Sequence, residues 1–400
     1  MASSIGPPEP GIPVRIALIS DIHANLEALQ TVLADIDQRI DTSKGDQIWN
    51  LGDIIGYGPN PVECADLVAK RCRWSLLGNH DYGVLYEPTN FNAVAERAAY
   101  WTREQFEAES ARDQAGAVKR WEFLGKLRVR VSEGPFLCVH GTPRRPINEY
   151  LFPEDAESSP GKMADIFKRI KSSGAHYCLV GHTHVPGVFT EDGDFYFAKE
   201  MNNQTWEFKL TSAANKTDPD SPDAVEGPRP ERLVINPGSV GQPRDLDPRA
   251  SYAIIDAEEA QDEHGQPVIR PRAVQFFRLE YDIATTRAKI AAVAEVIAAR
   301  NSAQRDETGC LERLADAPNE PALPWLDRHI AGLEATAGRD RKSAGIAAQL
   351  EACRGLRAEL AAQDGFSTRD LMRLLLERSP QSRADLERYS WLGNRLAEGR

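Results

Sequence analysis

The 400-residue sequence has few cysteines and lacks the segments that would direct it to a membrane or out of the cell. Its six cysteines show no CxxC pair and no regular spacing, which favours reduced thiols over a disulfide framework. The opening residues, MASSIGPPEPGIP, lack the basic and apolar regions of a secretory signal. No apolar run approaches the roughly 18 residues that a membrane span requires. We therefore expect a cytoplasmic protein with no membrane association.

A surplus of positive charge is also missing, because the formal net charge is −12. Proteins that bind nucleic acid generally carry a basic surface, so general nucleic-acid binding is not expected. A small phosphorylated substrate is still compatible with this charge, because bound metal ions can reverse the local field. The hydrophobic content of 41% and the charged content of 27% are typical of a globular protein.

The order of apolar and periodic segments predicts an α/β fold. Residues 14–19 and 47–51 are compact apolar runs, and each is followed by a segment of helical periodicity, 25–37 and 61–70. This alternation predicts βαβ units and a sheet that is largely parallel at its start. We expect helices over 91–128 and further strands at 135–139, 176–180, 187–190, 195–198, 206–210, 232–235 and 251–255.

The two ends of the chain and one internal segment differ from this pattern. Residues 1–12 are rich in Pro and Gly and are predicted to form a disordered arm, and the polar segment 211–231 is predicted to be a flexible loop. From residue 283 the sequence changes to Ala, Leu, Arg and Glu at helical spacing. We expect a main domain over 13–282 and a helical C-terminal extension over 283–400. This extension either covers apolar surface or mediates self-association into a homo-oligomer, and a lid or regulatory role is the alternative.

Histidine is scarce, and five of the eight histidines directly follow predicted strands. They occur in the motifs SDIH, GNHD, VHGT and VGHTH, each of which comes after an apolar run. In open α/β sheets, the loops beyond the carboxyl ends of the strands form the binding crevice. If these strands are neighbours, seven nitrogen and oxygen donors converge at one edge: Asp21, His23, Asp53, Asn79, His140, His182 and His184.

Seven donors are too many for one structural zinc ion, which is closed by four ligands and usually uses thiolates. They suit two divalent cations roughly 3.5–4 Å apart that share a bridging carboxylate and a hydroxide. Nitrogen and oxygen donors accept iron, zinc, cobalt or nickel as well as manganese, which we expect here. Taken alone, Asp21 could instead be a helix cap, since it lies shortly before a predicted helix.

As an ordered set, the motifs DIH, GDIIG, GNHD, HG and GHTH resemble the calcineurin-like metallophosphoesterase family. The resemblance covers roughly residues 14–280 and is specific as a set, although each motif alone is weak. It implies a four-layer αββα sandwich of two mixed sheets, with the metal site at the sheet edge. It also implies one metal on Asp21, His23, Asp53 and His184, and the other on Asp53, Asn79, His140 and His182, with Asp53 as the bridge.

The same resemblance implies a metal-dependent phosphoester hydrolase in which a hydroxide shared by the metals attacks phosphorus. His80 would protonate or hydrogen-bond the leaving oxygen, and Asp81 would orient the ring of His80. The segment VINPGSVGQPRDLDPRASYAIID is similar to a bacterial phosphodiesterase-like branch, so we expect a phosphodiesterase acting on a small or nucleotide-like substrate. The alternatives are a phosphomonoesterase or protein phosphatase, a dinucleoside polyphosphate hydrolase, and a binding scaffold without activity.

Several other residues are candidates for substrate contact. Arg144 and Arg145 follow HGTP and could bind a phosphate, although two arginines in a loop are more often simply solvated. Asn25 could contact substrate, but it is better placed to cap the helix that begins there. Tyr57 and Tyr82 lie beside the ligand motifs, where they either stack on an aryl group or pack over the loops.

Overall fold

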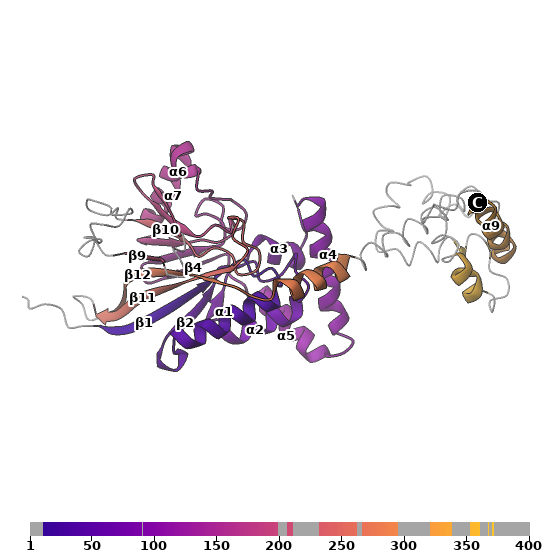
Figure 1. Cartoon of the computed structure of the whole chain (residues 1–400), viewed down its shortest axis with the longest axis horizontal. Helices are drawn as coiled ribbons and strands as arrows, with labels where there is room; N and C mark the ends of the chain where they lie inside the picture. Colours follow the sequence, from indigo (N-terminus) through magenta and orange to yellow (C-terminus); the bar gives the residue numbers. More distant parts are fainter. Residues whose placement is uncertain are drawn as a thin grey trace, which may run out of the picture. The chain divides into compact units, whose positions relative to one another are not determined.

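The computed structural model describes residues 11–89, 91–198, 206–210, 232–261, 266–294, 321–337, 353–360, 367 and 370–371. The chain divides into two compact units, residues 1–290 and 291–400 (Figure 1). The predicted arm, apart from residues 11 and 12, and the predicted loop over 211–231 lie outside the described residues. Among the helices that are described, none is both long enough and apolar enough to cross a membrane.

The first sheet has six strands in the order β3-β2-β1-β11-β12-β9. Their bounds are β1 (Ile12–Ile19), β2 (Gln47–Asn50), β3 (Trp74–Ser75), β9 (Trp206–Lys209), β11 (Ala250–Gln261) and β12 (Pro267–Leu279). Strands β1, β2 and β3 pair in parallel, whereas β11 joins the other edge of β1 in the antiparallel direction. The predicted parallel start of the sheet is confirmed, and the sheet as a whole is mixed.

The second sheet also has six strands, in the order β4-β5-β6-β10-β7-β8. Their bounds are β4 (Arg130–Glu133), β5 (Phe136–Val139), β6 (Tyr177–Leu179), β7 (Gly187–Thr190), β8 (Phe195–Phe197) and β10 (Leu233–Asn236). Strands β5, β6 and β10 are parallel, and the remaining pairs are antiparallel. Strands β4 and β12 were not predicted, because β4 buries only one residue and β12 contains two prolines.

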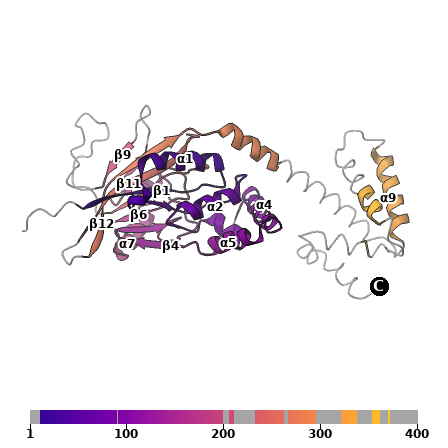
Figure 2. The ribbon, with the colours of Figure 1, turned by 90° about the horizontal axis from the view of Figure 1, so that it is seen from below.

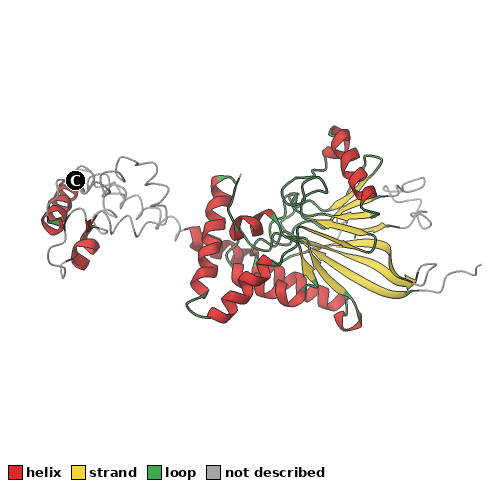
Figure 3. Ribbon diagram, turned by 180° about the vertical axis from the view of Figure 1, so that it is seen from behind, coloured by secondary structure: helices red, strands yellow, loops and turns green. Residues whose placement is uncertain are grey.

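Helices lie on both outer sides of the two sheets (Figures 2 and 3). The first sheet is accompanied by α1 (Leu26–Arg39), α2 (Pro61–Arg71), α3 (Asn79–Leu85), α4 (Ala93–Glu109) and α5 (Gln114–Gly125), with the 3-10 helix η1 (Thr42–Lys44) after α1. The second is accompanied by α6 (Asp155–Ser158) and α7 (Pro160–Ser172). Residues of both sheets, including Leu18, Trp49, Cys138 and Ile235, form one buried cluster between them. The predicted four-layer αββα sandwich is confirmed.

The amphipathic helices explain how the outer layers are held. Helix α1 buries Leu29, Val32 and Ile36 against the first sheet, at the spacing that places them on one helical face. Helix α7 does the same on the second sheet with Ile166 and Ile170. Truncating one such buried side chain to Ala typically costs about 2–5 kcal/mol, so these faces contribute strongly to stability.

The predicted extension begins at residue 283, and its first residues, 283–290, fall in the first unit. Residues 283–294 are helical. The Thr286 hydroxyl donates to Asn25 Oδ1 over 3.1 Å, and Lys289 forms an ion pair with Glu27 of α1. In the second unit, the described residues include helix α9 (Ala322–Ala337).

Candidate metal centre

Seven polar side chains lie at the carboxyl ends of strands of both sheets. Asp21 and His23 follow β1, Asp53 follows β2, Asn79 opens α3 after β3, His140 follows β5, and His182 and His184 follow β6. The six carboxylate and imidazole side chains are buried and form two clusters. The donor atoms within each cluster lie within 4.8 Å of one another. The predicted convergence of strand ends therefore occurs in the folded protein.

The first cluster contains Asp21, His23, Asp53 and His184. Nε2 of His184 lies 3.3 Å from Asp21 Oδ1, and Nε2 of His23 lies 3.6 Å from Asp53 Oδ2. Nδ1 of His184 lies 2.5 Å from the Gln242 carbonyl and therefore donates to it. In a neutral ring, this leaves the Nε2 lone pair facing His23 Nε2 at 3.2 Å. Two imidazole nitrogens and two carboxylates directed at one point match the donor preferences of a transition-metal cation.

The second cluster contains Asp53, His140 and His182, and Asn79 lies beside it. Nε2 of His140 lies 3.3 Å from Asp53 Oδ2, the same oxygen that His23 approaches in the first cluster. Asp53 therefore belongs to both clusters through one oxygen, which is the arrangement needed for a bridging carboxylate. Its other oxygen, Oδ1, accepts a hydrogen bond of 2.9 Å from the backbone N–H of His80.

The backbone at these donors is unusual. Asp21, His23, Asp53, His182 and His184 all have positive φ angles, between 49° and 64°. A residue other than glycine in this left-handed region costs roughly 1–2 kcal/mol, so the surrounding contacts must hold it there. Backbone bonds do so, because Asp21 N–H donates to the Gly52 carbonyl and His23 N–H donates to the Asp53 carbonyl, each at 3.0 Å.

Close packing at Gly78 places Asp53 against the start of α3. A Cβ atom on Gly78 would lie 2.0 Å from Asp53 Oδ1, which no side chain could tolerate. Only glycine therefore allows the bridging carboxylate to approach the first turn of α3, where it accepts the His80 N–H.

The two buried carboxylates give the centre its negative charge. Burial raises the pKa of Asp21, but the facing imidazoles of His184 and His140 outweigh burial and hold this pKa below its usual range. The same balance, with His140 as the main opposing partner, lowers the pKa of Asp53. Burial lowers the pKa of His182 to about 3, so this ring is neutral at pH 7 and can bind a metal through its lone pair.

His140 differs from the other rings of the centre. Burial lowers its pKa, but Asp53 outweighs burial and raises this pKa to about 9. Its Nδ1 is 2.8 Å from the carbonyl of Leu51, which fixes the ring so that Nε2 faces the centre. A metal that binds at Nε2 must therefore displace a proton at neutral pH.

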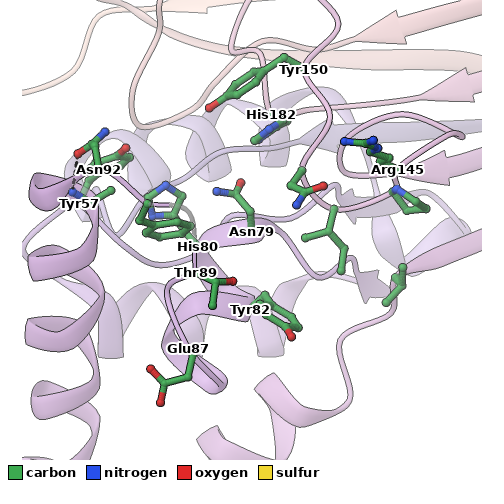
Figure 4. Close-up of a pocket in the computed structure, with 16 residues that line it drawn as sticks. Tyr57, Asn79, His80, Tyr82, Glu87, Thr89, Asn92, Arg145, Tyr150 and His182 are labelled. Atoms are coloured by element: carbon green, nitrogen blue, oxygen red, sulfur yellow. Dashed lines mark hydrogen bonds between the residues drawn. The ribbon is translucent and has the colours of Figure 1, made fainter. Parts of the chain in front are cut away.

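His80 lies next to the clusters and lines a cavity with Asn79 and His182 (Figure 4). Its ring packs against Tyr57, with 4.3 Å between ring centroids, and against Phe91 at 4.7 Å. On the other side, a Cβ atom on Gly56 would lie 2.6 Å from His80 Nδ1, so the ring fits closely over this glycine. Burial lowers the pKa of His80 to about 4, which makes the ring neutral at pH 7.

Asp81 does not hold the ring of His80, contrary to the expectation from the sequence. Its Oδ1 accepts hydrogen bonds from the N–H groups of Ile54 and Ile55 at 2.9 and 3.2 Å, and its Oδ2 accepts from Gly78 N–H at 3.0 Å. The reason is the helix α3, in which successive side chains point in different directions. Asp81 therefore stabilises the loop that carries Asp53 by accepting hydrogen bonds from its backbone.

The two adjacent arginines have different surroundings. Arg145 lines the cavity, as expected for a residue that contacts substrate. Arg144 instead pairs with Glu149 at 3.6 Å and with Asp165 at 3.4 Å and is absent from the cavity lining, so its expected substrate contact is not supported.

Asn25 is buried and serves the helix rather than a substrate, which corrects its assignment as a substrate-binding residue. Its Oδ1 accepts from Ala28 N–H at 3.2 Å, and this caps α1. Its amide donates to the Gly241 carbonyl at 2.9 Å and to the hydroxyl of Tyr281 at 3.2 Å. Both the Oδ1 and the amide nitrogen of Asn25 are therefore hydrogen-bonded within the protein.

The cavity has a volume of about 520 Å³ and opens directly onto the second cluster (Figure 4). Asn79, His80 and His182 line it beside the centre, and Tyr57 and Phe91 add aromatic surface. The remaining lining residues are Tyr82, Glu87, Thr89, Asn92, Ala95, Val129, Arg145, Pro146, Ile147, Asn148 and Tyr150. Its size falls in the range of pockets that bind small molecules.

Three residues beside the centre, Phe91, Tyr150 and Arg244, are not indicated as site residues by the sequence motifs. Phe91 and Tyr150 occur in segments without a motif, and their ring contacts with His80 and His182 depend on the folded structure. Arg244 lies in the segment VINPGSVGQPRDLDPRASYAIID, which carries part of the family resemblance, and its backbone N–H donates to the carbonyl of His184 at 3.4 Å. Only for Arg244 did the sequence contain a signal.

The centre contains buried atoms whose hydrogen-bonding capacity is unused. Asn79 Oδ1, His140 Nε2 and His182 Nε2 are buried and have no hydrogen-bond partner among the described residues, and the same holds for Nδ1 of His23. Leaving a buried polar atom unpaired costs roughly 1–3 kcal/mol. Three of these atoms belong to the second cluster and its neighbour Asn79, so a cation bound there would use them. The residues therefore fit a pair of divalent metal ions.

Comparison with known proteins gives an independent view of the chain. Residues 14–186 match the sequence model of a family described as calcineurin-like phosphoesterase, and this stretch contains all seven donors. An uncharacterized protein of Methanocaldococcus jannaschii is 33% identical over 282 residues, which are 69% of this chain and 91% of that protein. Among solved structures, a metallophosphoesterase from Sphaerobacter thermophilus is 35% identical, covering 70% of this chain and 94% of that chain, with a TM-score of 0.49.

Proposed function

Because the chain belongs to the calcineurin-like metallophosphoesterase family, we propose that it is a phosphodiesterase that acts on a small, nucleotide-like substrate. The observation that carries this proposal is the cavity of about 520 Å³ beside the second cluster. A substrate whose phosphate reaches Asn79 and His182 would extend the rest of its structure along this cavity.

The residues of the chain divide the chemical work. When bound, two divalent ions supply a nucleophile at neutral pH and neutralise charge on the phosphate oxygens. Asp53 fixes the separation of the two clusters, because both reach its Oδ2. His80 is neutral at pH 7 and donates a ring N–H to an oxygen of the phosphoester, which stabilises negative charge as it develops there. Tyr57 and Phe91 hold its ring in place.

The charge of the cavity supports a diester over a monoester. Among its described lining residues, Arg145 is the only arginine or lysine and Glu87 the only carboxylate, and they lie at different ends (Figure 4). A dianionic monoester would gain from additional cations, whereas a diester with one negative charge needs fewer. The aromatic and amide side chains along the wall suit an organic group attached to the second ester oxygen.

A substrate panel on the manganese-loaded protein tests this function. We expect faster hydrolysis of an aryl phosphodiester than of the matching aryl monoester and of diadenosine tetraphosphate. Protein stripped with a chelator is the control and should be inactive until Mn²⁺ is restored. A preference for the monoester or for diadenosine tetraphosphate would replace the proposal with the corresponding alternative. Stoichiometric metal without hydrolysis of any phosphoester would favour a binding scaffold.

Arg145 and Arg144 provide a matched pair of variants. We expect Arg145→Met to raise KM for the phosphodiester about tenfold with little change in kcat, because a lost charge-assisted hydrogen bond to substrate is worth roughly 1.5–3 kcal/mol before solvent screening of an exposed residue. Arg144→Met should leave KM within about twofold, because its ion pairs lie outside the cavity lining. Steady-state kinetics of both variants, measured under the same conditions, give the two KM values for the phosphodiester. An unchanged KM in Arg145→Met would show that Arg145 does not bind substrate, and a tenfold increase in Arg144→Met would show that Arg144 contributes to binding despite its ion pairs.

A further inference from the structure

The imidazole of His182 lies flat against the ring of Tyr150. Their centroids are 3.9 Å apart, and the ring planes differ by 18°. Figure 4 shows the two side chains together at the wall of the cavity. The ring of Phe152 is stacked with Tyr150, at 5.2 Å and 13°. The ring of Tyr150 is therefore held by aromatic packing, while the residue as a whole is 37% exposed and lines the cavity.

The three strand-end histidines of the second sheet are held in two different ways. Backbone carbonyls accept from His140 and His184 at the ring nitrogen that faces away from the centre, as is usual for metal-binding histidines. For His182, the hydrogen bonds within the described residues come from its backbone N–H, which donates to both oxygens of Asp21 at 3.1 Å. Its ring is stacked with Tyr150 and also contacts the ring of His140, at 5.0 Å between centroids.

The backbone beside Tyr150 is fastened to the backbone beside His182. Thr183 Oγ1 donates to the carbonyl of Leu151 at 2.9 Å and accepts from its N–H at 3.2 Å, and both residues are buried. Lys162 adds a bond of 2.7 Å to the carbonyl of Tyr150. These contacts fix the two rings relative to each other, although 31 residues separate Tyr150 from His182 (182 − 150 − 1).

We propose that Tyr150 is a positioning residue for the second cluster and acts through its ring by holding the imidazole of His182 toward the metal. A metal withdraws electron density from a bound imidazole, and the electron-rich phenol ring opposite it gains attraction as a result. This inference rests on the metal centre of the proposed function and is independent of the substrate. Because Tyr150 also lines the cavity, an occupant of the cavity touches the residue that aligns His182.

Titration of chelator-stripped protein with Mn²⁺ alone tests this role. We expect Tyr150→Leu to weaken the second-cluster binding step about three- to tenfold and to leave the first-cluster step within about twofold, in line with the strength of an aromatic pair. Tyr150→Phe keeps the ring and should bind like the unmodified protein. The second-cluster step is assigned with Asn79→Ala, which removes a neighbouring donor. In Tyr150→Leu, raising Mn²⁺ should restore most of kcat.

Four results would overturn the proposal. Equal weakening of both binding steps in Tyr150→Leu would show a general loss of folding. Phe152→Leu keeps the contact between Tyr150 and His182, so equal weakening of both steps in this variant as well would identify that loss of folding. Weakening in Tyr150→Phe as strong as in Tyr150→Leu would assign the effect to the hydroxyl. Unchanged Mn²⁺ binding in Tyr150→Leu would show that the stacking of Tyr150 on His182 does not affect metal affinity. An absence of Mn²⁺ binding in the unmodified protein would remove the metal centre itself, whereas a failed substrate panel with normal Mn²⁺ binding would leave Tyr150 in its role.

Discussion

Replacing Asp53 with Asn is expected to remove most of the bound metal and to lower kcat more than about 10³-fold, because this residue belongs to both clusters. His23 of the first cluster and His140 of the second both approach Asp53 Oδ2, at 3.6 and 3.3 Å. Asn has nearly the same shape but carries no charge, so two cations would share a site with only Asp21 to neutralise them. Metal content of the purified variant and kcat with the phosphodiester check this expectation.

Asn79→Ala is the comparison variant for Asp53→Asn. Asn79 lies beside the second cluster only, and its buried Oδ1 has no hydrogen-bond partner among the described residues. Its loss should reduce the metal content toward one ion per chain rather than toward none. If Asp53→Asn kept two metal ions with the affinity of the unmodified protein, Asp53 would not be the shared ligand.

Replacing His80 with Ala is expected to lower kcat about 10²–10⁴-fold while both metal ions are retained. The reason is that His80 lines the cavity but belongs to neither cluster. Its ring contacts Tyr57, Phe91 and the ring of His23. Its backbone N–H, which bonds Asp53, is kept in the alanine variant. The measurement is kcat at saturating phosphodiester, together with the metal content of the same sample.

Phe91→Leu is a control for the His80 variant, because it loosens the packing of the ring and keeps the ring itself. We expect a much smaller loss of kcat in this variant than in His80→Ala. Loss of metal from His80→Ala would contradict the assignment and would place His80 among the residues that maintain the centre. Retained metal with unchanged kcat would show that the reaction needs no hydrogen bond from this position.

The strands and the donor positions could be predicted because their signals are local. Residues 14–19 form an apolar run long enough for a strand buried on both faces, and the polar motif that follows marks its end. Parallel strands bring their carboxyl ends to one edge, so Asp21 and Asp53 meet for reasons of topology alone. The mixed second sheet adds His140 and His182 by the same rule.

The errors arose where the folded structure decides between partners that are equally near in sequence. Asp81 follows His80 directly, but the start of a helix at Asn79 turns its carboxylate back to three backbone N–H groups. Arg144 and Arg145 are adjacent, but Arg144 forms ion pairs with Glu149 and Asp165, whereas Arg145 lines the cavity.

The contact between Tyr150 and His182 could not be predicted from spacing. It depends on the pair of hydrogen bonds between Leu151 and Thr183, which lie in separate loops of the fold. Periodicity and local motifs describe which face a residue occupies, and they carry no information about which distant ring will lie on it.

The chain order of the contacts around the first cluster has a consequence for how the protein is made. His184 is held by the carbonyl of Gln242, and the carbonyl of Asp21 accepts from the Ser239 hydroxyl and from Gly241 N–H. A ribosome delivers Asp21 more than two hundred residues before these partners. The nascent chain therefore passes most of its synthesis with incomplete ligand loops, and the first cluster can be completed only after the segment around 239–242 has emerged.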